Sequence, residues 1–226
     1  MSKLLLVISW ALSILTLSTA ANAQQVFSPT FTGVSSSFQD VEQSPGFLTV
    51  SASSVVDPFY PSDVFVEEFA NFAVFDLTSL SSPVSSANLE YFLPSGGYDS
   101  SDLTEDFVIH DFPGNPSSLS YGGFGDFPDL SSGVLLGSTT VDQSDEGTFV
   151  SVQLNSDGIS EINSNAGGLV AFGGSGAAFT PGQSLGFGGL GSNSVSLIVT
   201  PTAVPEPGCG NVIVIFGLVG LRRRRE

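Results

Sequence analysis

Carboxylates are the only abundant side chains in this sequence that could do chemistry. The chain holds 22 Asp and Glu residues but a single His and a single Cys. Two adjacent pairs, Glu67 with Glu68 and Glu105 with Asp106, could supply the acid and the base that glycoside cleavage requires. Neighbouring residues of a strand point to opposite faces, so we expect each pair to offer one outward group. A carbohydrate-active enzyme with paired carboxylates is therefore the alternative to a non-catalytic protein.

Calcium binding is a second chemistry that carboxylates allow. Asp99, Asp102, Glu105 and Asp106 lie close together in a segment that contains serines, and calcium takes about six to eight oxygen ligands. The segment has neither the EF-hand spacing nor a repeated Gly-Asp pattern, and a solvated acidic loop explains the same residues. We expect no cofactor, with calcium at this segment as the one exception.

The other catalytic residue types are too few for a site. His110 is the only imidazole, which excludes a site with several His ligands and argues against a His-based triad. It follows Phe107–Ile109 and precedes Phe112, so we expect a strand residue beside a core. Cys209 lies near the carboxyl end, and no G-x-S-x-G elbow with its catalytic partners can be identified around any serine. The sequence favours a protein that is not an enzyme.

The cations occupy only the two ends of the chain. Lys3 and Arg222 to Arg225 are the five basic residues, and all acidic residues except Glu226 lie between Gln24 and Pro207, a span with a charge of about −21. Phosphate recognition depends on Lys and Arg, so nucleic-acid binding is excluded. Charged residues are 12% of the chain and 19 Phe are present, so the span has the apolar material for a folded core.

Residues 1–23 have the layout of a signal peptide. Lys3 precedes an apolar stretch from Leu4 to Leu17, and Ala21-Asn22-Ala23 stands before Gln24, as at a signal peptidase cleavage site. We expect export, with cleavage between Ala23 and Gln24. An uncleaved membrane helix is the alternative.

Residues 204–226 combine three parts in a fixed order. Val204-Pro205-Glu206-Pro207 precedes the mostly apolar stretch Gly208–Leu221, and four arginines, Arg222, Arg223, Arg224 and Arg225, follow. As a helix the apolar stretch would span about 21 Å, short of a hydrocarbon core of about 30 Å. Arginines stay on the cytoplasmic side, so this tail would stop in the inner membrane with the preceding domain outside.

The order of these parts resembles the PEP-CTERM sorting signal. The resemblance implies that Val204, Pro205, Glu206 and Pro207 are recognised by an exosortase, a membrane-embedded cysteine transpeptidase that removes the tail. It also implies transient insertion in the inner membrane, then delivery to the cell surface or extracellular matrix of a Gram-negative bacterium, where such proteins accompany exopolysaccharide and biofilm. A single-pass membrane tail is the alternative.

Between these ends, residues 24–203 predict one all-β domain, an antiparallel β-sandwich. Short apolar runs are separated by turn-forming residues at the spacing of such folds. Ala87, Leu89, Tyr91 and Leu93 alternate with polar residues, as do Val150, Val152 and Leu154, so these faces should form the core. The predicted strands are Phe47–Val56, Val64–Phe69, Asn71–Leu77, Ala87–Leu93, Asp106–Phe112, Val134–Val141, Thr148–Leu154, Leu169–Phe172 and Val195–Thr200.

One short helix and two glycine-rich stretches complete the predicted domain. Ser156–Asn165 predicts a helix with Ser156 or Asp157 as its cap and Gly167 as its stop, and we expect it to cover one end of the sandwich. Pro113–Gly133 is expected to form a long ordered loop, and Gly173–Gly191 is a second stretch rich in glycine. Within the first, Phe124 and Phe127, beside Tyr121, form either a platform for a sugar or an apolar contact tucked under the loop.

The strand pattern carries a second resemblance. Asn71–Leu77 followed by Val84–Leu93 is similar to surface β-sandwich domains related to carbohydrate-binding modules, which implies a jelly-roll-like fold. Gly147–Leu154 followed by Ile162–Gly174 is similar to segments of other PEP-CTERM proteins. We expect a non-catalytic surface protein associated with exopolysaccharide or the cell envelope. A secreted enzyme and a matrix protein without ligand are the alternatives.

The charge distribution predicts that salt stabilises the domain. Because the folded span between Gln24 and Pro207 concentrates carboxylates with no Lys or Arg to offset them, self-repulsion opposes folding at low ionic strength. The Debye length falls from about 8 Å at physiological salt to about 3 Å near 1 M. We expect the melting temperature to rise along a sodium chloride series, and to rise further with millimolar calcium only if a calcium site exists. A flat salt profile would contradict the prediction.

Overall fold

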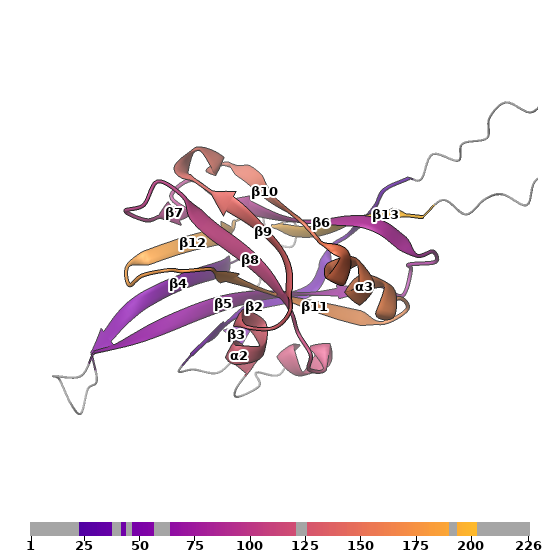
Figure 1. Cartoon of the computed structure of the whole chain (residues 1–226), viewed down its shortest axis with the longest axis horizontal. Coiled ribbons are helices and arrows are strands. Elements are labelled where there is room, and N and C mark those ends of the chain that lie inside the picture. Colours follow the sequence, from indigo (N-terminus) through magenta and orange to yellow (C-terminus); the bar gives the residue numbers. More distant parts are fainter. Residues whose placement is uncertain are drawn as a thin grey trace, which may run out of the picture. The chain divides into compact units, whose positions relative to one another are not determined.

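The structure is a computed structural model that describes residues 23–37, 42–43, 47–56, 64–120, 126–189 and 194–202. Within it, Gln24–Thr202 forms one compact unit. That unit consists mainly of antiparallel strands with a few short helices (Figure 1). The predicted signal segment and sorting tail lie outside the described residues.

The described strands belong to two sheets, and every pairing in them is antiparallel. The smaller sheet has four strands in the order β1-β13-β6-β10. Their bounds are β1 Gln25–Phe27, β13 Val195–Pro201, β6 Val84–Leu93 and β10 Thr148–Gln153.

The larger sheet runs in the order β7-β12-β4-β5-β11-β8-β9, and β2 pairs with both β5 and β3. The chain therefore enters in the smaller sheet through β1 and crosses directly to the larger one through β2. The bounds are β2 Pro29–Ser36, β3 Glu42–Gln43, β4 Phe47–Val56, β5 Val64–Asp76, β7 Tyr98–Asp99, β8 Glu105–Asp111, β9 Leu135–Val141, β11 Leu169–Gly176 and β12 Gln183–Gly188.

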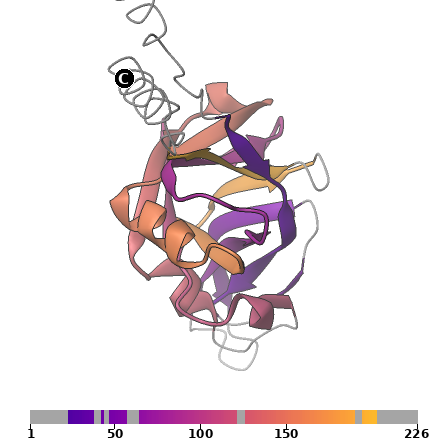
Figure 2. The same ribbon diagram turned by 90° about the vertical axis from the view of Figure 1, so that its right-hand side faces the viewer.

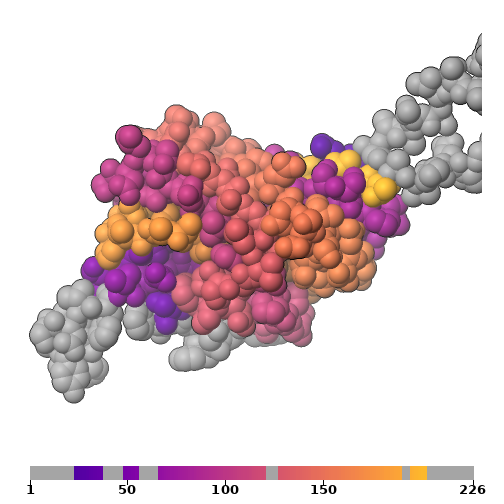
Figure 3. Space-filling view, viewed as in Figure 1, coloured from indigo at the N-terminus to yellow at the C-terminus, as the bar shows by residue number. Residues whose placement is uncertain are grey.

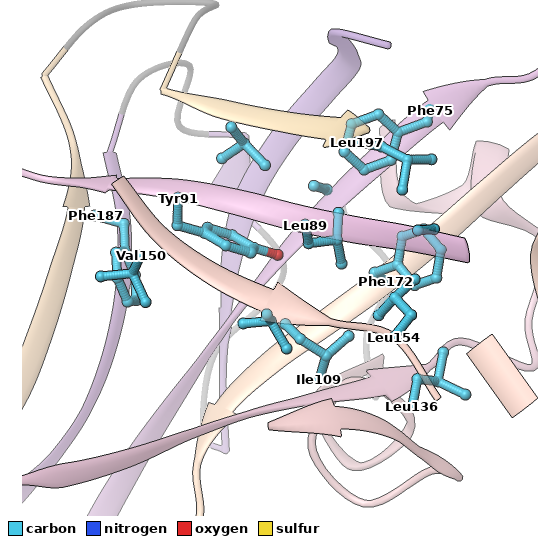
Figure 4. Packing of buried hydrophobic residues seen from close by; sticks show 14 of the residues in the cluster. Phe75, Leu89, Tyr91, Ile109, Leu136, Val150, Leu154, Phe172, Phe187 and Leu197 are labelled. Atoms are coloured by element: carbon cyan, nitrogen blue, oxygen red, sulfur yellow. The ribbon is translucent and has the colours of Figure 1, made fainter. Parts of the chain in front are cut away.

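Aromatic side chains from both sheets meet in the main core. The Tyr91 ring of β6 lies 5.1 Å from the Phe107 ring of β8 and 5.3 Å from the Phe187 ring of β12, and the two Phe rings are 4.7 Å apart, centroid to centroid. All three side chains are fully buried. Figure 4 shows Tyr91 and Leu89 pointing into the space between the sheets. The two sheets thus hold together through apolar and aromatic contact.

A second, smaller core covers the outer face of the larger sheet. Two short helices pack there, the 3-10 helix η1 (Pro116–Ser120) and the α-helix α2 (Asp126–Ser131). Leu119 of η1 and Leu130 of α2 are fully buried with Phe72 and Val74 of β5. Because β5 is covered on both faces, the run from Ala70 to Phe75 has no exposed residue, which is the pattern of a central strand.

The helix α3 (Ser156–Ser164) covers one end of the domain, as the sequence predicts. Ile162 is fully buried in the main core. Its cap is Asn155 rather than Ser156 or Asp157: the Asn155 side chain accepts hydrogen bonds from the amides of Asp157 and Gly158, at 2.9 and 3.0 Å. Gly167 follows the helix with φ of 86°, the left-handed geometry expected after a helix end. Figure 3 shows α3 filling this end of the surface.

Both ends of the described domain lie at the end that α3 covers. β1 pairs with β13, with Gln25 opposite Val199, and the Thr202 amide donates to the Pro83 carbonyl at 2.6 Å, just before β6. Asn163 of α3 also bonds the backbone of Val84, at 2.7 and 3.1 Å. Figure 2 looks onto this end, with α3 in front of the sheets.

The all-β prediction is confirmed, and several strands match closely. β4 has the predicted bounds, and the alternation of β6 and β10 places Leu89, Tyr91 and Val152 in the core. His110 is a residue of β8 beside the core, as predicted, and its Nδ1 donates to the Gly133 carbonyl at 3.1 Å.

Two predictions about boundaries and loops are wrong. Val64–Phe69 and Asn71–Leu77 form one strand, β5, because its buried run continues through Ala70. The expected loop Pro113–Gly133 contains η1 and α2. The glycine-rich stretch Gly173–Gly191 contains the end of β11 and all of β12, and the strands that were not predicted are β1, β2, β3, β7 and β12.

Gly173 allows α2 to lie directly on β11, which predicts a steric effect. A Cβ at position 173 would overlap the backbone of Leu130, with the Leu130 Cα at 2.7 Å. We expect Gly173→Ala to destabilise the domain by about 1–3 kcal/mol, the usual range for overpacking. The control is Gly186→Ala in β12, where the nearest atoms lie at 3.9 Å. Urea denaturation measures both, and equal stabilities of the two variants would contradict this packing.

Tyr91 predicts a loss of stability at alkaline pH. Burial raises the pKa of Tyr91 above its ordinary value of 10.0, so above pH 10 the unfolded chain ionises while the folded one does not. The stability contribution is present below pH 10 and is lost as pH rises. Its hydroxyl also has no hydrogen-bond partner among the described residues. We expect Tyr91→Phe to be neutral or stabilising at pH 7 and to flatten the alkaline decline in urea titrations. An unchanged decline in the variant would contradict this.

Candidate functional site

A pocket of about 280 Å³ opens where β5 and β11 separate beside α2. Its walls combine three phenyl rings, four serines and one carboxylate. They come from four segments of the chain that lie far apart in sequence. The lining residues are Ser51, Glu68, Phe69, Phe127, Ser131, Ser132, Ser175, Gly176, Ala177, Ala178 and Phe179.

The register of the sheet explains why the strands separate. β11 pairs with β5 only as far as Gly174 opposite Asn71. Beyond that point β11 continues along β8, to Gly176 opposite Phe107. β5 instead runs along β4, with Phe69 opposite Ser51. β4 and β11 both lie on the side of β5 opposite β2, so β4 replaces β11 as the partner of β5 beyond Asn71 while β11 keeps β8.

Glycines of β11 let the walls of the pocket approach closely. A Cβ at Gly176 would overlap the ring of Phe179, so the glycine makes room for that ring. Gly173 does the same for α2, which carries Phe127, Ser131 and Ser132 to the pocket. The walls are therefore set by backbone packing, as in pockets that are formed before a ligand arrives.

The polar side chains of the pocket differ in which hydrogen-bond donors and acceptors remain available to a ligand. Ser131 and Ser132 donate their hydroxyl protons to the carbonyls of Phe127 and Pro128, at 2.8 and 2.7 Å, which leaves oxygen lone pairs as acceptors. The side chains of Ser51 and Ser175 have no partner among the described residues. The pocket thus holds both donors and acceptors.

Glu68 supplies the one carboxylate among the described residues of the lining. Its backbone is fixed, because its carbonyl accepts from the Ser37 amide at 2.9 Å and its amide donates to the Ser37 hydroxyl oxygen at 3.1 Å. Its side chain is exposed. The carboxylate can accept hydrogen bonds from a ligand and cannot donate them.

The acidic segment predicted to bind calcium is organised by internal hydrogen bonds. The Ser100 hydroxyl donates to Glu105. Asp102 accepts from the buried Gln183 amide at 2.7 Å. Asp106 accepts from Thr140 of β9 at 2.9 Å. In the described ranges, no three His, Cys, Asp or Glu side chains converge as metal ligands. A calcium site at Asp99, Asp102, Glu105 and Asp106 stays a prediction.

The pKa of Tyr98 is raised by burial and, in part, by the charges of this acidic segment. Burial raises the pKa of Tyr98, a hydrogen bond with Ser100 lowers it, and the nearby charges of Glu105, Asp102 and Asp142 raise it further. Its hydroxyl donates to the Asp102 carbonyl at 2.9 Å. Asp142 itself has a lowered pKa because the Ser144 hydroxyl and amide both donate to it.

The two carboxylate pairs separate as strand geometry predicts. Glu67 is buried and its Oε1 has no hydrogen-bond partner among the described residues, while Glu68 is exposed. Glu105 is likewise buried and Asp106 exposed. Each pair therefore presents one carboxylate to each side of its strand.

The pocket was only partly visible in the sequence. Phe127 lines it and also packs against the second core, so it has features of both predicted alternatives. Tyr121 and Phe124 lie outside the described residues. Phe69, Phe179 and the four serines were not predicted as a site, since the only signal for them is the glycine run before Phe179.

Comparisons with known proteins leave the family open. No protein-family model and no curated protein matches the chain. Across the stretches that the structure describes, no helix has the length and apolar character needed to span a bilayer. The predicted sorting residues Val204–Pro207 and Arg222–Arg225, and the residues Ala21 and Cys209, lie outside those stretches.

Proposed function

We propose that this protein is an exported, non-catalytic β-sandwich that an exosortase sorts to the cell surface or extracellular matrix, where it associates with exopolysaccharide or the cell envelope. The observation that carries the proposal is the tail of the sequence: the Val204–Pro207 motif, the apolar stretch and the terminal arginines stand in the order of a PEP-CTERM signal. Signal peptidase and exosortase are the processing partners, and insertion in the inner membrane is transient.

The position of the pocket agrees with attachment of the domain through its carboxyl end. The described domain ends at Thr202, which bonds to Pro83 at the end of the fold that α3 covers, whereas the pocket lies beside α2 (Figure 1).

Two features favour binding over catalysis. Among the described residues Glu68 is the only carboxylate in the pocket lining, whereas glycoside cleavage uses two carboxyl groups at a defined separation. The pairs Glu67–Glu68 and Glu105–Asp106 are each divided between the faces of a strand. The secreted carbohydrate-active enzyme remains the alternative function.

The proposed domain type is jelly-roll-like, as in surface domains related to carbohydrate-binding modules. Support comes from the two antiparallel sheets, the Tyr91 contact between them and the direct crossing of the chain from β1 to β2. Fold alone assigns no activity, so the function rests on the tail and on the chemistry of the pocket.

Sorting predicts a processed extracellular form. In a Gram-negative host that has an exosortase, mass spectrometry of the extracellular fraction should find a chain that begins at Gln24 and lacks Arg222–Arg225. Glu206→Ala should abolish this form because it alters the motif. Glu226→Ala, the same change beyond the motif, should leave it unchanged. Detection only of full-length protein fixed in the inner membrane would contradict the proposal.

A further inference from the structure

We propose that the pocket between β5, β11 and α2 binds a single non-anionic pyranose residue of a polysaccharide. This inference deepens the proposed function, on which it rests, by naming the ligand class of the site. It depends on the size, wall chemistry, charge and rigidity of the pocket.

The size of the pocket selects a small ligand. Its volume of about 280 Å³ lies just below the range of roughly 300–1,000 Å³ for sites that take drug-sized molecules. One sugar ring matches such a space, and a longer segment of a polysaccharide would continue outside it. The site is thus suited to one residue within a chain or at its end.

The walls of the pocket match the two kinds of surface that a pyranose presents. Most of the lining is polar, and Phe69, Phe127 and Phe179 add a smaller apolar part that the C–H faces of a sugar can contact. The serines and Glu68 offer hydrogen-bonding groups to its hydroxyls. Ser51 and Ser175 can donate as well as accept, whereas Glu68 only accepts. A ligand that carries many hydroxyl groups, each both donor and acceptor, satisfies this set.

The negative charge of the domain disfavours binding of an acidic sugar. Between Gln24 and Thr202 the chain has no Lys or Arg, and its one imidazole, His110, is engaged with Gly133. A uronate, sulfate or phosphate group in the pocket would therefore meet Glu68 with no opposing charge, and burial of an unpaired charge is costly. The pocket excludes anionic residues and accepts uncharged ones.

Backbone packing keeps the site in shape without a ligand. The Phe179 ring occupies the space that the missing Cβ of Gly176 leaves. Leu130, fully buried, fixes α2 against β11 and with it Phe127, Ser131 and Ser132. Little ordering is needed on binding, which favours affinity.

The test is calorimetric titration of the purified full chain with the methyl glycosides of glucose, galactose, mannose and N-acetylglucosamine, and with methyl glucuronide as the acidic probe. We expect at least one neutral glycoside to bind and the glucuronide to bind at least tenfold more weakly than it. Phe179→Ala should weaken neutral binding at least tenfold, while the control Phe149→Ala, an exposed ring on β10, should not change it.

Glu68 provides a second, independent variant. Glu68→Gln should weaken neutral binding severalfold and reduce the discrimination against methyl glucuronide, because the repelling charge is gone. Glu90→Gln, the same change at a half-exposed position of β6, is the control and should alter neither. Circular dichroism melting confirms that each variant is folded.

Three results would overturn the pocket proposal: no neutral glycoside binds, the glucuronide binds best, or Phe179→Ala and Glu68→Gln bind like their controls. Location is measured separately on cells that express the same chain. A processed extracellular protein that fails these titrations removes only the pocket proposal. A chain that binds the glycoside but stays in the inner membrane removes the sorting function and leaves the site.

Discussion

The aromatic contact of Tyr91 with Phe107 and Phe187 holds the two sheets together, and the rest of the domain depends on it. Between Gln24 and Thr202 the chain contains no Lys or Arg, so no salt bridge with either residue can share this role. The three rings lie within 4.7 to 5.3 Å of one another and are fully buried. Buried apolar area and backbone hydrogen bonds must therefore provide the stability that offsets the repulsion between surface carboxylates.

The glycine run of β11 connects this core to the pocket. Gly174 allows the Phe107 ring to lie against β11 on the inner face, where a Cβ would come within 2.8 Å of the ring. On the outer face, Gly173 accommodates α2, whereas Gly176, on the same face as Gly174, makes room for Phe179, which packs against the main core. One short segment thus lets the sheets pack and also sets two walls of the pocket. Because these glycines have no side chains, residues of neighbouring elements can pack directly against the backbone of β11.

The sequence predicted the parts of the fold whose signal is local. The alternation of Leu89 and Tyr91 with polar residues predicted β6, and Ile159 and Ile162 predicted α3. β12 was missed although Leu185 and Phe187 alternate in it, because they stand in a stretch rich in glycine, with Gly186 between them. The pocket was missed for another reason: Glu68, Phe127 and Phe179 come together through strand register and glycine contacts, and neither leaves a periodic pattern in the sequence. The sorting tail differs from the pocket, because the order of its residues in the sequence is the whole evidence for it.

The central claim is that a sugar binds at the gap between β5 and β11 and not on the smaller sheet, where the half-buried Phe92 and the exposed Phe149 form a pair with ring centroids 5.4 Å apart. The most direct measurement is an NMR titration of the full chain labelled at phenylalanine, with a neutral methyl glycoside as the ligand. The account predicts shifts of the Phe69, Phe127 and Phe179 ring signals, with those of Phe92 and Phe149 unchanged. Shifts confined to Phe92 and Phe149 would contradict it.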